Sequence, residues 1–400
     1  TREGHDVYWL LHEDSFIGRN FKGGHKHPVF YTGNVLNAEE FYDQLTKTAL
    51  EKPGDAGKIQ EMASEIVPTL ARTVLMENEE VLKQLDDVGI DVAIVDGLVV
   101  TKYLYLIAHR SGIPIVTLTE GIEPWHARIP WLPSFVPLNI LPMTDKLTFI
   151  ERVQNLFLYI FFHLKNLAPP LPDDVEAAYS RYGTFSSTND IIRNTKLWIT
   201  MSDPVLDYPK PRMPNMIEAG GLITRPAKPL TERWSTILED ANEHGLVLVS
   251  FGSMSSSFPV HISKKLLEAF AELPQTIIWR FNNTDNLPIP SNVIIADWLP
   301  QNDILAHPNV EVFITHCGNN GQFEAVYHGV PMIGMPLHSD QFYNARRITH
   351  KGFGLLLDIT QFEPNDLVAA VEEVITNPSY RENISKASLI FHDRPDTPVE

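Results

Sequence analysis

Cysteine and long hydrophobic runs are what this sequence of 400 residues most clearly lacks. Its single cysteine, Cys317, excludes an intramolecular disulfide and a cysteine-rich zinc site. No run of about 18 apolar residues occurs, so no segment of this sequence predicts a membrane-spanning helix. The composition, with 44% hydrophobic and 20% charged residues, is that of a globular protein, and it excludes intrinsic disorder and fibrous repeats.

Positive charge is also in short supply. Lysine and arginine together number 32, against 50 aspartates and glutamates, which gives a formal net charge of -18. Such a surface repels phosphate backbones and anionic lipid headgroups, so we expect no nucleic-acid partner. The acidity says nothing about a small substrate. The length suggests two domains with ample core.

The sequence begins without an initiator methionine, a charged leader or a signal peptide. Its first eleven residues are typical of the end of a helix, a turn at Gly4 and an apolar strand. The end at Glu400 is equally abrupt. We therefore expect a piece of a longer chain, in which missing targeting signals carry little information about location.

Short apolar runs alternate with amphipathic stretches along the sequence. This alternation predicts βαβ units and parallel sheets, and the apolar character of the strands indicates that both sheet faces are covered. We expect helices at residues 71–86, 99–110, 263–271, 322–328 and 341–351. We expect strands at residues 6–11, 91–95, 113–118, 197–201, 246–251, 275–281, 293–296, 310–315 and 330–335.

A segment rich in proline and glycine, residues 208–229, interrupts this rhythm and is typical of a linker. We therefore predict an N-terminal domain of residues 1–212 and a C-terminal domain of residues 213–400. A second unusual segment, residues 148–167, is aromatic and amphipathic. We expect a buried or inter-domain helix there, and the alternative is a membrane-surface helix or a wall of an apolar pocket.

The segment of residues 298–341 carries the most chemical information. A buried strand at 310–315 is followed by a turn of small residues from His316 to Gly321 and then by a helix. Free backbone N–H groups and the helix dipole make such a helix start a phosphate site. His316, Asn320 and Glu324 are spaced four apart, so a helix that starts near His316 would place all three on one face.

These three side chains and their neighbours suit a nucleoside diphosphate. An imidazole and an amide can donate to phosphate oxygens, and a carboxylate deeper along the helix can accept from ribose hydroxyls. Trp298 offers a stacking face for a base, with Gln301 beside it. Asp340 and Gln341 follow a strand end, where ligands of open α/β sheets bind, and they suit the hydroxyls of a sugar.

This segment resembles the nucleotide-sugar signature of the family 1 UDP-glycosyltransferases. The plant version of the signature is matched by W-x-P-Q at 298–301, T-H-C-G-x-N at 315–320, Glu324 and Asp340-Gln341, with all spacings preserved. The remainder resembles the animal UDP-glucuronosyltransferase branch, through TFIERVQNLF (148–157), SFGSM (250–254), PQNDIL (300–305), EAVYHGVPM (324–332) and FHDRP (391–395). The resemblance implies a GT-B fold, in which two Rossmann-like parallel-sheet α/β domains face a cleft.

The resemblance also implies a role for each matching residue. Trp298 would stack on uracil beside Gln301, and Glu324 would bind the ribose. Asn319 stands where plant members carry tryptophan, so its contact is open, and Cys317 is expected to be a small packing residue. The sugar would be held by Asp340 and Gln341, and the diphosphate by Ser253, His316, Gly318, Asn320 and Gly321.

Transfer with inversion needs a base that removes the proton of the acceptor hydroxyl. In the family this base is a histidine in the loop before the first helix, which would lie upstream of Thr1. Asp96 matches the aspartate that orients it, and the alternative is that Asp96 caps the following helix. We therefore expect residues 1–400 to be nearly inactive alone. Because the sequence has no Asp-x-Asp pair, we expect neither a metal nor another cofactor, with UDP-sugar as a co-substrate.

The resemblance implies transfer of a hexose or hexuronic acid, with glucuronic acid favoured, from UDP to a small lipophilic acceptor. The alternatives are a UDP-glucose-specific glucosyltransferase, a catalytically silent nucleotide-sugar-binding homologue and, more weakly, an epimerase. The loops at 13–33 and 121–142 would select the acceptor. A lumenal endoplasmic reticulum location and a membrane anchor, both through segments outside this sequence, are further implications, and homo-oligomerisation stays open.

Overall fold

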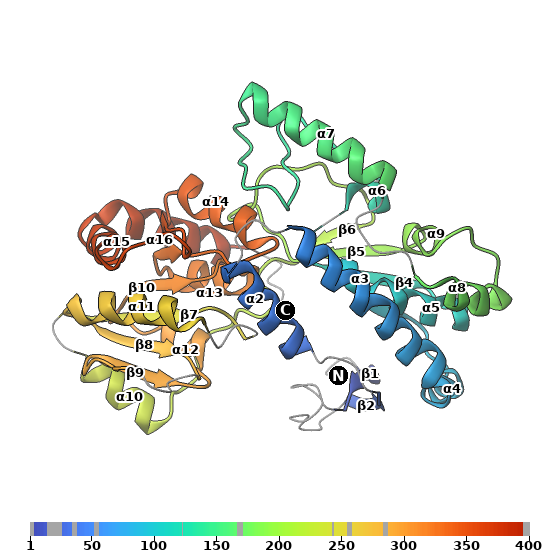
Figure 1. Cartoon of the computed structure of the whole chain (residues 1–400), viewed down its shortest axis with the longest axis horizontal. Helices are drawn as coiled ribbons and strands as arrows, with labels where there is room; N and C mark the ends of the chain where they lie inside the picture. The colour runs from blue at the N-terminus through green and yellow to red at the C-terminus, as the bar shows by residue number, and fades with distance from the viewer. Residues whose placement is uncertain are drawn as a thin grey trace.

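The computed structural model describes residues 4–13, 26–33, 38–51, 56–121, 123–165, 171–241, 244–253, 258–282 and 287–394. Its strands form three sheets in which every pair is parallel. In Figure 1 most of the C-terminal half, drawn in yellow to red, and most of the N-terminal half, drawn in blue to green, form two lobes. The blue helix α2 lies against the C-terminal lobe, where Leu50 joins its apolar core. The predicted α/β class with two parallel-sheet halves is confirmed.

The C-terminal sheet has six strands in the order β12-β11-β10-β7-β8-β9. From β7 the chain moves outward through β8 and β9, then crosses back to place β10 on the other side of β7. The carboxyl ends of β7 and β10 therefore lie side by side where the strand order reverses, the position at which open α/β sheets bind ligands. The strands are β7 (Leu246–Ser250), β8 (Thr276–Arg280), β9 (Val293–Ala296), β10 (Val310–Thr315), β11 (Met332–Gly334) and β12 (Gly354–Leu356).

Helices cover both faces of this sheet (Figure 1). One apolar cluster packs α11 and α15 on one face, and a second packs α13 and α16 on the other. All five residues of β7 are buried, as the apolar pattern predicted. The helices of this half are α10 (Glu232–Glu239), α11 (Val260–Glu272), α12 (Gln301–Leu305), α13 (Asn319–His328), α14 (Gln341–Lys351), α15 (Pro364–Thr376) and α16 (Pro378–His392).

The N-terminal half has a four-stranded sheet in the order β3-β4-β5-β6, with a separate pair of β1 and β2. The strands are β1 (Val7–His12), β2 (Lys26–Tyr31), β3 (Ala93–Asp96), β4 (Ile115–Thr119), β5 (Leu197–Thr200) and β6 (Met216–Glu218). The α-helices are α2 (Ala38–Glu51), α3 (Ala56–Arg72), α4 (Glu79–Val88), α5 (Tyr105–Ser111), α6 (Pro124–Ala127), α7 (Phe149–Lys165), α8 (Asp173–Tyr179) and α9 (Thr188–Arg193).

Two helices differ locally from the sequence-based expectations. The helix expected at 71–86 is divided into α3, a π-helical turn (Thr73–Glu77) and α4, because the Asn78 side chain donates to the carbonyl oxygens of Thr73 and Thr32 at 2.9 and 2.7 Å. The helix expected at 99–110 begins as a 3₁₀ turn (Val99–Leu104). Strand β6 pairs with β5 in the N-terminal sheet, and the domain boundary expected after residue 212 stays a prediction.

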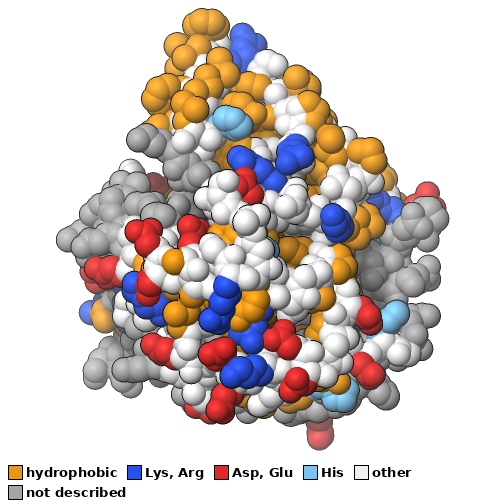
Figure 2. Space-filling model, turned by 90° about the vertical axis from the view of Figure 1, so that its right-hand side faces the viewer, with side chains coloured by type: hydrophobic (Ala, Val, Ile, Leu, Met, Phe, Trp, Pro, Cys, Tyr) orange, Lys and Arg blue, Asp and Glu red, His pale blue; other side chains and the backbone are white. Residues whose placement is uncertain are grey.

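Helix α7 lies at the top of the molecule in Figure 1, and the expectation of a buried helix is wrong. Among the α7 side chains whose burial is described, only Asn155 is buried, and it donates to the carbonyl oxygens of Pro133 and Val136. Figure 2 shows hydrophobic side chains gathered over the top of the molecule. The large exposed hydrophobic side chains of α7 are Phe149, Ile150, Val153, Leu156, Phe157, Ile160, Phe161 and Leu164. No described helix has the length and apolar character that a bilayer crossing requires.

Basic side chains of α14 join the two halves. The Arg347 guanidinium lies 2.6 Å from Asp207, which follows β5, and donates to Asn319 on α13 at 2.9 Å. Asn319 in turn donates to the Met201 carbonyl oxygen at the end of β5, at 2.8 Å. His350 lies 3.2 Å from Asp145. The helix that begins at the expected sugar contacts is therefore bonded along its length to the N-terminal half and the linker.

Candidate functional site

A cavity of about 1110 Å³ lies outside the carboxyl ends of β7 and β10 and reaches the ends of β3 and β4. Every site residue expected from the sequence lines it, so the fold brings together groups that are up to 245 positions apart. These residues are Asp96, Ser253, Trp298, Gln301, His316, Gly318, Asn320, Gly321, Glu324, Asp340 and Gln341. Their roles as ligand contacts stay predictions.

The start of α13 differs from the expectation in one respect. The helix begins at Asn319 with Gly318 as its N-cap residue, so Asn320 and Glu324 lie one helical turn apart, as expected. His316 precedes the helix and reaches the cavity from the loop after β10, so the expectation that all three share one helix face is wrong. The unpaired backbone N–H groups of the first turn border the cavity and favour an anion there.

The His316 imidazole fits between two glycines. A Cβ atom at Gly252 or Gly318 would lie 2.6 or 2.5 Å from its Nε2 atom, so any other residue at these positions would displace the ring. Burial of the ring, together with the nearby His338 and Arg280, lowers the pKa of His316 to about 3. A hydrogen bond with the Ser250 backbone opposes this shift. The ring is therefore neutral at physiological pH, and its single N–H can serve either the Ser250 backbone or a ligand.

Glu324 and Gln301 form a hydrogen-bonded pair across the cavity wall. The Gln301 Nε2 atom donates to the Glu324 Oε2 atom. Burial raises the pKa of Glu324, and the hydrogen bond from Gln301 opposes this effect. One carboxylate oxygen of Glu324 is thus oriented by Gln301, and the other can accept from a ligand hydroxyl.

The Trp298 side chain is 56% exposed, which keeps one face of the indole open to the cavity. The Arg280 guanidinium carbon lies 5.2 Å from the centre of the Trp298 ring, within cation–π range. Arg280 also donates to the carbonyl oxygens of Gly252 and Ser253. Arg280 therefore holds the indole ring of Trp298 in position for a base to stack on it.

Asp340 and Gln341 stand at the start of α14. The Gln341 Oε1 atom accepts from the backbone N–H groups of Leu337 and His338 at 2.8 and 3.1 Å, so its amide NH₂ is the group that can donate to a ligand. The Asn344 side chain donates to Asp340 at 2.5 Å. Burial raises the pKa of Asp340, while Asn344 and Arg347 oppose this.

Asp96 ends β3 and its carboxylate accepts from the Leu98 backbone N–H at 3.0 Å. Asp96 makes no capping hydrogen bond to the following 3₁₀ turn, whose N-cap residue is Leu98. The alternative that Asp96 caps this helix is therefore wrong. Its carboxyl group is accessible from the cavity, although the surrounding protein raises its pKa by burial. The position suits a carboxylate that holds a histidine oriented toward the cavity.

Several residues that line the cavity were not predicted from the sequence, chiefly Glu120, Arg280 and His338. Glu120 directly follows β4, just as Asp96 ends β3. Its place at a strand end could therefore have indicated that Glu120 lines the cavity. Burial raises the pKa of Glu120 to about 7, and the charges of Asp340 and Asp96 add to this shift. His338 and Arg280 also lie at or just after strand ends.

Cys317 and Asn319 have packing roles in this structure. Cys317 is fully buried in the apolar cluster on the α13 face of the sheet and adopts a left-handed φ of 70°, a conformation that favours glycine. Asn319 is occupied by its bonds to Met201 and Arg347. Within the described residues, no three acidic, histidine or cysteine side chains gather as a metal-binding group.

The acceptor loops are only partly described, since residues 14–25 and 122 lie outside the described ranges. The described part of the N-terminal half contributes mostly apolar side chains to its side of the cavity. These include Trp9, Leu11, Ile94, Leu98 and Leu118. Such a wall fits an acceptor with little polarity.

Comparison with known proteins identifies close relatives. The profile of the family described as "UDP-glucoronosyl and UDP-glucosyl transferase" matches residues 3–400. Human UDP-glucuronosyltransferase 1A9 is 35% identical over 339 residues, covering 82% of this chain and 62% of the relative. Rat UDP-glucuronosyltransferase 1A7 is 34% identical over 415 residues, covering 100% of this chain and 76% of the relative. The chain thus spans about three-fifths of the human relative.

Solved structures share the fold at low identity. The glycosyltransferase VinC in complex with dTDP aligns with a TM-score of 0.64 and 17% identity, covering 98% of this chain and 90% of VinC. Os79 from O. sativa in complex with UDP aligns with a TM-score of 0.61 and 16% identity, covering 96% of this chain and 89% of Os79. These likenesses support the GT-B arrangement of the two halves.

Proposed function

This chain belongs to the family of UDP-glucuronosyl and UDP-glucosyl transferases, and on that premise we propose that it transfers a hexose or hexuronic acid from UDP to a hydroxyl group of a small lipophilic acceptor, with inversion. Enzymes of this family use a UDP-sugar as substrate and need no metal. Similarity to animal UDP-glucuronosyltransferases favours glucuronic acid as the sugar, and the choice between it and a neutral hexose would depend on the charges at the sugar end of the cavity.

One observation carries this proposal: a single cavity is lined by the groups that a UDP-sugar needs. An accessible indole, a buried carboxylate, a helix start bordered by a neutral imidazole, and a carboxyl with an amide all line it. These groups would serve a uracil, a ribose, a diphosphate and a sugar, respectively. Donors that are already oriented would stabilise the charge that develops on the leaving diphosphate.

The acceptor would enter from the N-terminal half, where Asp96 would orient the general base. The histidines that line the cavity, His316 and His338, both come from the C-terminal half, and burial lowers both pKa values. We expect the base on a histidine upstream of Thr1. The silent nucleotide-sugar-binding homologue is the second candidate, because the described histidines that line the cavity both come from the half opposite to Asp96. Full turnover by residues 1–400 would contradict the upstream base.

The test of the proposal is the binding of UDP to residues 1–400, measured by isothermal titration calorimetry. We expect UDP to bind and ADP to bind at least about tenfold more weakly, because the Gln301 Oε1 atom beside Trp298 can accept from the N3–H group of uracil, a donor that adenine lacks, whereas the ribose is common to both. We expect the same UDP affinity in EDTA, since the helix start and His316 hold the diphosphate without a cation. Equal affinity for UDP and ADP would refute the proposed function, and a loss of binding in EDTA would refute metal independence.

Replacement of Trp298 tests the stacking shelf. Base–aromatic stacking contributes about 1–3 kcal/mol, so Trp298→Ala should weaken UDP binding roughly tenfold or more. Trp298→Phe should retain most of the affinity. Phe342→Ala is a matched control, because Phe342 is an exposed aromatic residue on the neighbouring α14 that does not line the cavity. If the Trp298 and Phe342 variants bind UDP equally well, the uracil does not stack on Trp298.

A further inference from the structure

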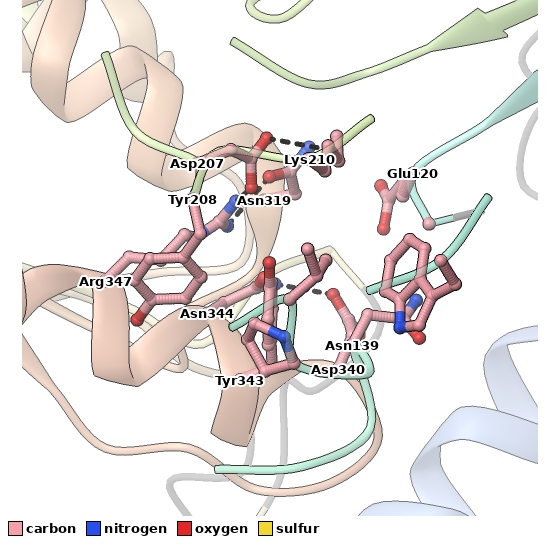
Figure 3. A pocket seen from close by; sticks show the side chains of 14 residues that line it. Glu120, Asn139, Asp207, Tyr208, Lys210, Asn319, Asp340, Tyr343, Asn344 and Arg347 are labelled. Atoms are coloured by element: carbon pink, nitrogen blue, oxygen red, sulfur yellow. Dashed lines mark hydrogen bonds and ion pairs between the residues drawn. The ribbon is translucent and has the colours of Figure 1, made fainter. Parts of the chain in front are cut away.

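Carboxyl groups from both halves meet at the sugar end of the cavity. Glu120 follows β4 in the N-terminal half, and Asp340 precedes α14 in the C-terminal half. Both residues also line a small side chamber of about 40 Å³ that adjoins the main cavity. In Figure 3 the carboxyl groups of Glu120 and Asp340 point into this chamber from opposite sides. Any group of the donor that extends beyond Asp340 therefore meets two acidic side chains.

The cations near these carboxyl groups are bonded elsewhere. Arg347 lines the chamber, but its guanidinium is held by Asp207 at 2.6 Å and Asn319 at 2.9 Å. Lys210 is also paired with Asp207, at 3.9 Å (Figure 3). Among the described residues of the chamber, no lysine or arginine contacts Glu120 or Asp340 through a hydrogen bond or ion pair.

The two arginines that line the main cavity belong to its nucleoside end. Arg225 forms a two-bond pair with Asp303, at 2.6 and 2.8 Å. Arg280 lies over Trp298. Both arginines of the main cavity therefore lie near the expected base, ribose and Ser253, together with the Glu324 carboxylate, whereas Glu120 and Asp340 lie beside the expected sugar.

The protonation behaviour of these carboxyl groups agrees with their environment. Burial is the main cause that raises the pKa of Glu120 to about 7, and Asp340 is the first of the charges that add to it. The charge of Arg347 opposes the rise in pKa at both carboxyl groups, but its guanidinium is bonded to Asp207 and Asn319. A further negative charge in the same space would have to be placed next to Asp340 and a partly ionised Glu120, to neither of which a described lysine or arginine of the chamber is bonded.

Resting on the proposed transferase function, we propose that Glu120 and Asp340 make this cavity select a donor with a neutral hexose and reject one with a hexuronic acid. A neutral hexose presents hydroxyl groups, which donate to these carboxyl oxygens. A hexuronic acid presents a carboxylate, which is repelled by them and can accept no hydrogen bond from an ionised carboxylate. Glu120 is the specificity-determining residue, because its carboxyl is the one added from the N-terminal half.

The test compares UDP, UDP-glucose and UDP-glucuronic acid in calorimetric titrations of residues 1–400. We expect UDP-glucose to bind at least as tightly as UDP, and UDP-glucuronic acid to bind about tenfold more weakly than UDP-glucose. In Glu120→Gln the two sugar nucleotides should differ by less than about threefold, while the affinity for UDP stays unchanged. Asp91→Asn is the matched control, since Asp91 is an exposed carboxylate at the opposite end of β3.

The outcomes separate this inference from the function on which it rests. If UDP does not bind, the proposed function fails. If UDP binds but UDP-glucuronic acid binds as tightly as UDP-glucose, the function stands and the charge selection is overturned. If the preference for glucose survives unchanged in Glu120→Gln, Glu120 is not the selecting residue. Retained UDP affinity in Glu120→Gln shows that the variant is folded, so a change in its sugar preference can be assigned to the lost carboxylate.

Discussion

Glu324→Ala is expected to weaken UDP binding about 100-fold, which corresponds to roughly 2.7 kcal/mol. Glu324 is 8% exposed and lies one helical turn beyond Asn320, at the depth where a ribose would sit. Hydrogen bonds to a charged group contribute about 1.5–3 kcal/mol each, and alanine removes those to the ribose together with the bond from Gln301. Isothermal titration calorimetry with UDP measures the loss.

Two further variants show whether this loss comes from the ribose contact. Glu324→Gln keeps the shape and one acceptor oxygen, so it should fall between the native chain and the alanine variant. Glu372→Gln removes an exposed carboxylate from α15 and should leave the affinity unchanged. A Glu324→Ala protein that binds UDP as well as the Glu372 variant would place the ribose elsewhere and remove the basis of the site assignment.

Arg347→Met is expected to lower the free energy of unfolding by about 3–5 kcal/mol, because it leaves Asp207 buried without its main partner. Arg347 is 2% exposed, and its guanidinium holds Asp207 and Asn319. Burial by itself would raise the pKa of Asp207, but Lys210 and Arg347 outweigh it and keep the carboxyl ionised. Urea unfolding followed by tryptophan fluorescence measures the change.

The neighbouring residue supplies a matched control for this prediction. Arg346 is exposed and donates to the Pro142 carbonyl oxygen, so Arg346→Met should cost less than about 1 kcal/mol. Adding Asp207→Asn to Arg347→Met should restore part of the stability, since the unpaired charge is then gone. Equal losses in the two single variants would mean that the Asp207 pair contributes little to the fold.

The C-terminal half of the site was predictable because its signals are local. Trp298, Gln301, His316, Asn320 and Glu324 fall within one stretch of strand, turn and helix, so spacing alone orders them along the chain. The fold class was equally accessible, since apolar strands such as β7 and β10 are buried on both faces and read as continuous hydrophobic runs.

The rest of the site depends on contacts between distant segments, which periodicity does not encode. Glu120 meets Asp340 only because the two halves dock through Arg347 and Asn319. Strands β6 and β12 have three residues each, too few for an alternating pattern. The exposure of α7 was missed because an amphipathic pattern indicates an apolar face and does not say what covers it.

The rate at which Cys317 reacts with a thiol reagent would report how often the C-terminal half opens. Its thiol is fully buried, and burial raises its pKa well above the usual range, so in the native state it is neither accessible nor a thiolate. No second cysteine competes for a reagent. A maleimide therefore labels the chain only while the layer between α13 and the sheet is open, and protection by a bound nucleotide would appear directly as slower labelling.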